Sequence, residues 1–113
     1  MLLLLDENLP KRLKLDFPKH QIFTVWEKDW NGIKNGELLQ ILVDNDFDAL
    51  LTFDKNLQHQ QNFLKYPITV FVMVALNNTY QQLKPLALVI NEILEAGVLL
   101  PGPKIISIGN SGT

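Results

Sequence analysis

The chain has 113 residues, of which 47% are hydrophobic and 19% are charged, the composition of a globular protein with a single core. Its net charge of −2 provides no broad positive field for a polynucleotide, although a bound divalent cation would reverse the sign locally. The absence of cysteine excludes disulfides, zinc–thiolate sites and cysteine nucleophiles. The first residues resemble no signal peptide, and no stretch reaches the ~20 apolar residues of a membrane span. We therefore expect one cytoplasmic domain over residues 1–113, with no membrane partner.

The first predicted element is a strand over residues 1–5, where four leucines follow one another and the run stops at Asp6. A continuous apolar run of this length is typical of a strand buried on both faces of a parallel sheet. Beyond it, Asn8 is a candidate N-cap for a short helix that has Pro10 in its first turn. The residues of this segment expected to face the core are Leu9, Leu13 and Phe17.

The rest of the chain alternates between strand and helix patterns. We predict further strands over 21–25, 47–53, 67–74 and 103–108. The predicted helices are one over 36–44 capped by Asn35, a short irregular one within 55–65, and one over 80–96 with a Thr79–Gln82 capping box and Gly97 at its end. Residues 109–113 are predicted to form a loose tail. Connections of ten or more residues between successive strands imply parallel pairing with right-handed crossovers. The predicted fold is therefore a three-layer α/β domain, with a mostly parallel sheet of about five strands and helices on both faces.

Three acidic residues from distant parts of the sequence are predicted to meet at one edge of this sheet. Asp6 and Asp54 each follow a buried strand, and Glu37 lies in the first turn of the helix after the second strand. Ligand sites of open parallel sheets form at the carboxyl ends of the strands, and Mg²⁺ or Mn²⁺ prefers carboxylate oxygens. Each residue also has a simpler local interpretation: a cap for Asp6, a complement to the helix dipole for Glu37 and a turn former for Asp54. Their convergence favours a metal site.

Further polar residues are expected near the same edge. Asp48 is excluded, because six residues at ~3.3 Å each place it roughly 20 Å from Asp54. Trp26 and Trp30 would either stack on bases or pack their loop onto the domain. The candidates for an outer shell around the metal are Glu7, Asn8, Glu27 and Asp29, and those for phosphate contacts, unless they are simply solvated charges, are Lys11, Arg12, Lys34 and Lys55.

Several of these segments resemble a known family. They are Leu-Leu-Asp6-Glu7-Asn8-Leu-Pro10, Trp30-Asn-Gly32, Asn35-Gly-Glu37-Leu-Leu and Leu-Leu-Thr52-Phe-Asp54-Lys55. In order and spacing they resemble the small bacterial PIN-like domains, which are relatives of the PIN-domain toxins of toxin–antitoxin systems. The resemblance covers essentially the whole chain. The start at Asp6 and the Thr-x-Asp ending at Asp54 are its most specific parts.

The resemblance implies a parallel sheet with an acidic metal site and Mg²⁺- or Mn²⁺-dependent cleavage of RNA. Asp6, Glu37 and Asp54 match the family's acidic positions and would hold the metal and serve catalysis. Single-stranded RNA would be the substrate and an antitoxin protein a further partner. The chain departs from the family pattern at Gly36, where an Asp is common, and a fourth acidic residue has no clear place.

Two alternatives remain open at this point. One is a phosphoacceptor receiver domain, which also has paired acids after the first strand and an Asp after the third. Against it, Lys104 begins the last strand instead of ending it. The other is a catalytically degenerate PIN-like domain that binds proteins, in which Leu88 and Val89 could form the seam of a homodimer.

Overall fold

The computed structural model describes residues 1–57 and 63–108, and its centre is a parallel sheet of five strands. In chain order the strands are β1 (Leu2–Leu5), β2 (Gln21–Thr24), β3 (Ala49–Thr52), β4 (Thr69–Met73) and β5 (Gly102–Ile106). All neighbouring pairs are parallel, and the order across the sheet is β2-β1-β3-β4-β5. The predicted α/β fold class is confirmed.

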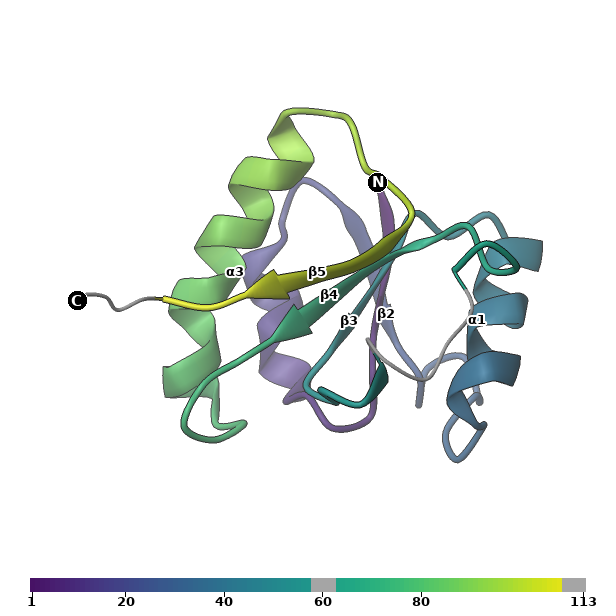
Figure 1. Cartoon of the computed structure of the whole chain (residues 1–113). Coiled ribbons are helices and arrows are strands. Elements are labelled where there is room, and N and C mark those ends of the chain that lie inside the picture. The colour runs from purple at the N-terminus through teal and green to yellow at the C-terminus, as the bar shows by residue number, and fades with distance from the viewer. Residues whose placement is uncertain (58–62, 109–113) are drawn as a thin grey trace.

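Helices cover both faces of the sheet. A short 3₁₀ helix, η1 (Lys11–Asp16), and α3 (Tyr80–Glu95) lie on one side, and α1 (Asn35–Asp44) lies on the other. Figure 1 shows α3 and α1 on opposite sides of the sheet, with β5 nearest the viewer. The predicted helix of 55–65 falls partly, and the tail of 109–113 wholly, outside the described residues. Within those residues, no helix is long and apolar enough to cross a membrane.

The side-chain alternation of the strands divides the interior into two cores. Leu3 and Leu5 point to the side of η1 and α3, whereas Leu4 points to the side of α1. All three are completely buried, as expected for a strand sandwiched between helices. The predicted core residues of the first connection, Leu9, Leu13 and Phe17, are buried in the first of these cores.

The crossovers are not all of one hand, contrary to the prediction. The connections β1–η1–β2 and β4–α3–β5 lie on the same face but travel across the sheet in opposite directions, so they have opposite hand. The connection β2–α1–β3 covers the other face and crosses the sheet in the direction opposite to β1–η1–β2, so these two connections have the same hand. Because right-handed crossovers are the strong rule, β4–α3–β5 is the exception. Its 16 residues cover the face that the six residues of η1 leave open.

Two of the three predicted helix caps lie at other residues in the structure. Pro10, rather than Asn8, occupies the N-cap position of η1, and Lys34, rather than Asn35, that of α1. Thr79 does occupy the predicted N-cap position of α3, but its side chain makes no capping hydrogen bond and its hydroxyl donates to Asn77 Oδ1 at 2.6 Å instead. Both asparagines that were expected to cap helices have partners beyond their own turn, at the carboxyl edge of the sheet.

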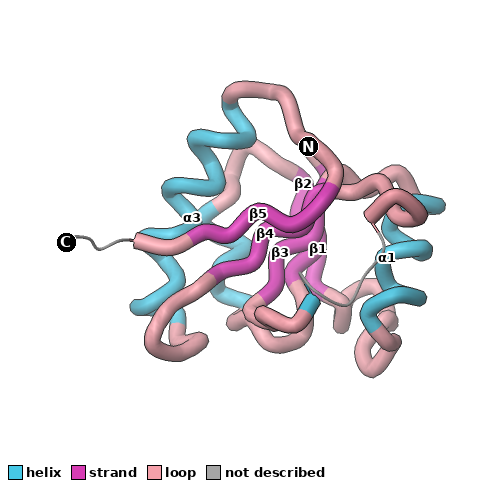
Figure 2. The backbone as a smooth tube through the Cα atoms, viewed as in Figure 1, coloured by secondary structure: helices cyan, strands magenta, loops and turns pink. Residues whose placement is uncertain are grey.

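That edge is where the loops after the strands gather. Figure 2 shows loops leaving the ends of β1 and β3 side by side. The backbone continues the pairing just beyond the strands, since the N–H of Asp6 donates to Leu51 O at 2.9 Å and the N–H of Val25 donates to Leu5 O at 3.2 Å. The residues that follow β1, β2 and β3 are therefore held at fixed positions relative to one another.

Candidate functional site

Asp6 is the first residue after β1, and its side chain is buried, with 7% of its surface exposed. Its Oδ1 accepts from the backbone N–H of Glu7 at 2.9 Å, and its Oδ2 accepts from the Thr52 hydroxyl at 2.7 Å. Thr52 ends β3 and is completely buried. Asp6 is thus fixed by both of its oxygens, one to its own loop and one to the neighbouring strand.

The Thr52 hydroxyl also joins Asp6 to Asp54. Its oxygen accepts from the backbone N–H of Asp54 at 3.1 Å. The Asp54 carboxylate accepts from the N–H of Asn56 at 2.9 Å and from Asn35 Nδ2, in the first turn of α1, at 3.2 Å. The two predicted aspartates are therefore brought together in one hydrogen-bonded group with Thr52 and Asn35.

The electrostatic environment of Asp6 is unfavourable to its charge. Burial is the main cause that raises its pKa above the ordinary value of 3.8, and the negative charges of Glu7 and Asp54 raise it further. The hydrogen bonds from Thr52 and from the Glu7 N–H act in the opposite direction. Neither salt bridge found among the described residues involves Asp6, and the partners of its carboxylate there are the Thr52 hydroxyl and the Glu7 N–H.

Glu37 does not join this group. It lies in the first turn of α1 with its side chain exposed, and Asn35 is the residue of that turn that reaches Asp54. Over residues 1–57 and 63–108, no three acidic or histidine side chains lie close enough together to hold a metal ion. The structure therefore unites two of the three predicted acids.

A pair of carboxylates nevertheless fits a hard divalent cation. Mg²⁺ commonly binds one or two carboxylates and retains several waters, so Asp6 and Asp54 form a donor set of adequate size. A cation there would also relieve the repulsion that raises the pKa of Asp6. The pair therefore matches the number of carboxylates that Mg²⁺ commonly uses.

The predicted outer-shell residues have structural partners. Glu7 Oε1 accepts from the Gly32 N–H at 3.2 Å, and Asn8 Oδ1 accepts from the Phe53 N–H at 3.1 Å. Both contacts tie the loop after β1 to a neighbouring loop. Asn8 in particular joins the residues that follow β1 to those that follow β3, and so helps to set the position of Asp6 relative to Asp54.

The two acidic residues after β2, Glu27 and Asp29, have local structural roles. Glu27 accepts from Lys14 Nζ at 2.7 Å and from the Thr24 N–H at 2.8 Å, and the Lys14 bond is the main cause that lowers its pKa. Asp29 is exposed and adopts a left-handed conformation, with φ of 62°, which aspartate tolerates better than most residues. Neither residue shares a hydrogen bond with Asp6 or Asp54 in the described part of the chain.

The four predicted phosphate contacts are all exposed. Lys34 and Lys55 flank the Asn35–Asp54 contact in sequence, one on each side of it. Lys11 and Arg12 lie at the start of η1 against aromatic rings: Lys11 Nζ is 6.0 Å from the centre of the Trp26 ring, and the Arg12 guanidinium is 4.2 Å from that of Tyr80. In the described part of the chain, none of the four forms a hydrogen bond with Asp6, Thr52 or Asp54.

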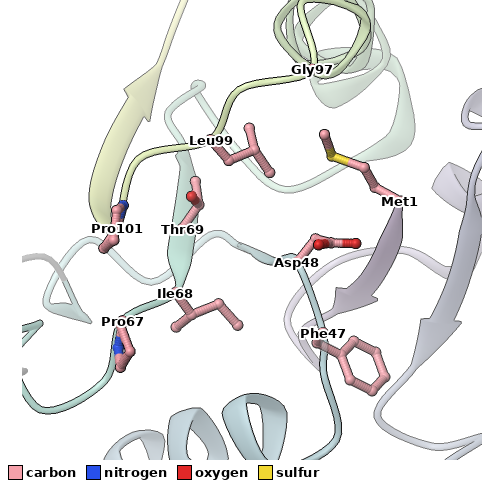
Figure 3. A pocket seen from close by; sticks show the side chains of 9 residues that line it. All are labelled: Met1, Phe47, Asp48, Pro67, Ile68, Thr69, Gly97, Leu99 and Pro101. Atoms are coloured by element: carbon pink, nitrogen blue, oxygen red, sulfur yellow. The ribbon is translucent and has the colours of Figure 1, made fainter.

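A cavity of about 270 Å³ lies at the opposite, amino edge of the sheet (Figure 3). Asp48 is one of its lining residues, and its carboxylate accepts from the Leu2 N–H at 2.7 Å. The predicted exclusion of Asp48 from the acidic site is therefore confirmed. The rest of the lining is mainly apolar, with Met1, Ile68 and Leu99 among the residues drawn, and it offers no second acidic group.

Two members of the site, Thr52 and Asn35, were not predicted to have a role there. The signal was present in the sequence, because Thr52 stands two residues before Asp54 and Asn35 two residues before Glu37. Comparison with protein-family models, with curated proteins and with solved structures found no match.

Proposed function

We propose that the protein is a divalent-metal-dependent ribonuclease of the PIN-like class, acting as the toxin of a toxin–antitoxin pair. The observation that carries the proposal is the Asp6–Thr52–Asp54 group at the carboxyl edge of the sheet. It ties the Asp6 carboxylate to the backbone of Asp54, at the edge where ligands of parallel sheets bind. The resemblance to PIN-like domains supplies the class of reaction, hydrolysis of RNA phosphodiesters.

In this proposal Asp6 and Asp54 hold Mg²⁺ or Mn²⁺, which supplies a polarised water and stabilises charge on the phosphate. Thr52 and Asn35 keep the two carboxylates oriented. Lys34 and Lys55, on the two segments that meet at Asn35 and Asp54, attract the phosphate backbone to the edge. Glu37 has no part in this arrangement, because two positions along α1 rotate its side chain by about 200° from that of Asn35.

The test is cleavage of labelled single-stranded RNA with Mn²⁺, with and without chelator. We expect cleavage that the chelator abolishes and that Asp54→Asn reduces by at least about 100-fold, the scale of losing one metal-centred electrostatic contribution. Asp46→Asn is the matched control, because Asp46 is exposed at the far edge and its left-handed φ of 60° suits Asn equally well. Cleavage that survives in Asp54→Asn would refute the assignment, and absence of cleavage in the unsubstituted protein would favour a binding module.

One observation favours a second candidate, a phosphoacceptor receiver-like domain. The strand order β2-β1-β3-β4-β5 is that of receiver domains and flavodoxin. However, the reversed hand of β4–α3–β5 departs from a regular doubly wound fold, and Lys104 lies in the middle of β5 with its side chain exposed. Incubation with acetyl phosphate and Mg²⁺ separates the two: a receiver gains one phosphate on Asp54 by intact mass, and a nuclease does not.

A further inference from the structure

The two edge strands of the sheet, β2 and β5, differ in how their outward backbone groups are satisfied. Successive residues of a strand direct their N–H and C=O groups to alternate sides, so an edge strand leaves every second residue facing away from its neighbour. On β2 the outward Thr24 N–H donates to Glu27 Oε1 at 2.8 Å, and Lys14 Nζ donates to the same carboxylate at 2.7 Å. The β2 edge is therefore blocked by side chains of the chain itself.

The edge at β5 has no such block. Gly102 and Ile106 form backbone hydrogen bonds toward β4. The alternate residues, whose backbone groups face away from the sheet, are therefore Pro103, Ile105 and Ser107. In the described part of the chain these outward groups have no hydrogen-bond partner. Figures 1 and 2 show β5 nearest the viewer, with no described segment passing in front of it.

Exposed apolar side chains gather around the same edge. Ile105, in β5 itself, is 47% exposed. Among the other exposed large apolar residues of the described chain, Val98 and Leu100 precede β5, and Leu76 and Ile108 lie beside its carboxyl end. Single exposed apolar residues are normal on a protein surface, whereas a contiguous group is typical of an interaction surface.

Each end of β5 also has a cavity on the side of the sheet that α3 covers. The cavity beside the amino end, of about 280 Å³, is lined by Val98 and Leu100 together with a residue of α3. The cavity beside the carboxyl end, of about 460 Å³, is lined by Leu76 and Ile108 together with residues of α3. The two ends of β5 thus present apolar side chains on the same face of the sheet.

We propose that β5 pairs antiparallel with β5 of a second copy of this chain, joining two sheets into one across a twofold axis at Ile105. Such an axis brings each end of one strand opposite the other end of its partner and keeps α3 of both copies on the same face. The amino-end side chains Val98 and Leu100 then come opposite the carboxyl-end cavity of the partner subunit. The apolar groups at the two ends of β5 complement each other, which favours a second copy over an unrelated strand.

The hydrogen-bonding groups of β5 fit this register. With Ile105 opposite Ile105 of the partner subunit, each residue donates its N–H to the other's carbonyl. Farther along, the Ser107 N–H meets the carbonyl of the partner's Pro103, and the missing proline N–H leaves unpaired only the Ser107 carbonyl, at an exposed residue. Lys104, a residue type that often protects edges, lies on the opposite face of the strand from Ile105. Its charge is therefore not buried between the two Ile105 side chains.

This pairing does not depend on the proposed nuclease. The strand β4 separates β5 from β1 and β3, which lead to Asp6 and Asp54. The twofold axis also reverses the direction of β5, so the carboxyl edges of the two copies lie at opposite ends of the joined sheet. Dimerisation and metal-dependent cleavage can therefore be gained or lost separately.

The first test is the mass of the intact chain in solution, measured by sedimentation equilibrium from about 1 µM to about 1 mM. We expect a dimer, and we expect Ile105→Lys, which places like charges at the axis, to weaken it at least about 100-fold. Leu88→Lys is the matched control, because Leu88 is an exposed apolar residue of α3, on another surface. Circular dichroism verifies that both variants are folded. A monomer throughout, or a dimer that survives Ile105→Lys, would overturn the proposal.

The second test reports the register and does not require a charged variant. The chain contains no cysteine, so Ile105→Cys introduces a single thiol, which the axis places opposite its own copy. The Cα atoms of such a pair are about 5.5 Å apart, within the range of a disulfide. We expect oxidation to give a covalent dimer at least about tenfold faster for Ile105→Cys than for Leu88→Cys, and the difference to vanish in urea, where the sheet is lost. Equal rates in the folded proteins would overturn the proposal.

Discussion

Replacing Thr52 by valine tests the bond that unites the acidic group. Valine has nearly the same shape, so the change removes the hydroxyl that donates to Asp6 and accepts from Asp54 and leaves both groups without that partner. A hydrogen bond to a charged group contributes about 1.5–3 kcal/mol, and an unsatisfied buried N–H costs about 1 kcal/mol more. We expect Thr52→Val to lower the free energy of unfolding by about 2–4 kcal/mol near neutral pH in the absence of metal.

Thr69→Val is the matched control. Thr69 is also a buried strand residue, with 4% of its surface exposed, and its hydroxyl donates to an uncharged acceptor, Leu100 O, at 2.6 Å. Its loss should cost about 1 kcal/mol. Urea unfolding of the two variants, at about pH 4 and about pH 7, separates the effects, because only the bond to Asp6 changes strength when that carboxylate is protonated. Equal losses for the two variants at both pH values would refute the reasoning.

Three further predictions follow from burial and backbone geometry. Burial raises the folded-state pKa of Asp6 above 3.8, so the folded protein retains this proton to a higher pH than the unfolded chain, and the stability due to Asp6 is lost as pH rises through the folded pKa. In urea titrations with chelator, the free energy of unfolding of Asp6→Asn should therefore exceed that of the unsubstituted protein by an amount that grows from about pH 4 to about pH 7. A constant difference between the two proteins would contradict this prediction. Leu42→Ala empties a fully buried position of α1 and should cost about 2–5 kcal/mol in the same assay, against a negligible loss for Leu88→Ala, whose side chain is 64% exposed. Gly97→Ala forces a side chain into φ of 79° at the end of α3 and should cost about 1–2 kcal/mol, although the site has open space for a methyl group; a neutral result would show that the turn relaxes.

The sequence was sufficient to predict the layered parallel sheet, because its signals are local. The leucine run that ends at Asp6 forms β1, and the apolar run that ends at Thr52 forms β3. Every residue of β3 is buried, and so is every residue of β1 except Leu2. The helical period after Thr79 gives α3, and Gly97 ends it with a positive φ. Each of these features depends on the pattern of a few neighbouring residues.

The hand of the last crossover could not be predicted in this way. The general rule favours a right-handed connection, but the position of α3 is decided by which face of the sheet remains uncovered. That depends on the short η1 and on the strand order together, and neither is encoded within α3. The hand of the β4–α3–β5 connection is therefore set by elements that are distant in sequence from α3.

The site was predictable in outline, and its detail was not. Strand endings place Asp6 and Asp54 at one edge, which the hydrogen bonds through Thr52 bear out. Asn35 was expected to cap α1, yet its side chain reaches Asp54 instead, because a helix that begins one residue earlier turns a different side chain toward the sheet. A shift of one residue moves a side chain by about 100° around a helix, so the third predicted acid, Glu37, could not be placed from the sequence.

The binding of Mn²⁺ to the protein, measured by isothermal titration calorimetry, tests the central claim most directly. We predict one site per chain, at least about tenfold weaker in Asp54→Asn and unchanged in Asp46→Asn. Affinity equal in the two variants, or no binding to the unsubstituted protein, would contradict the account.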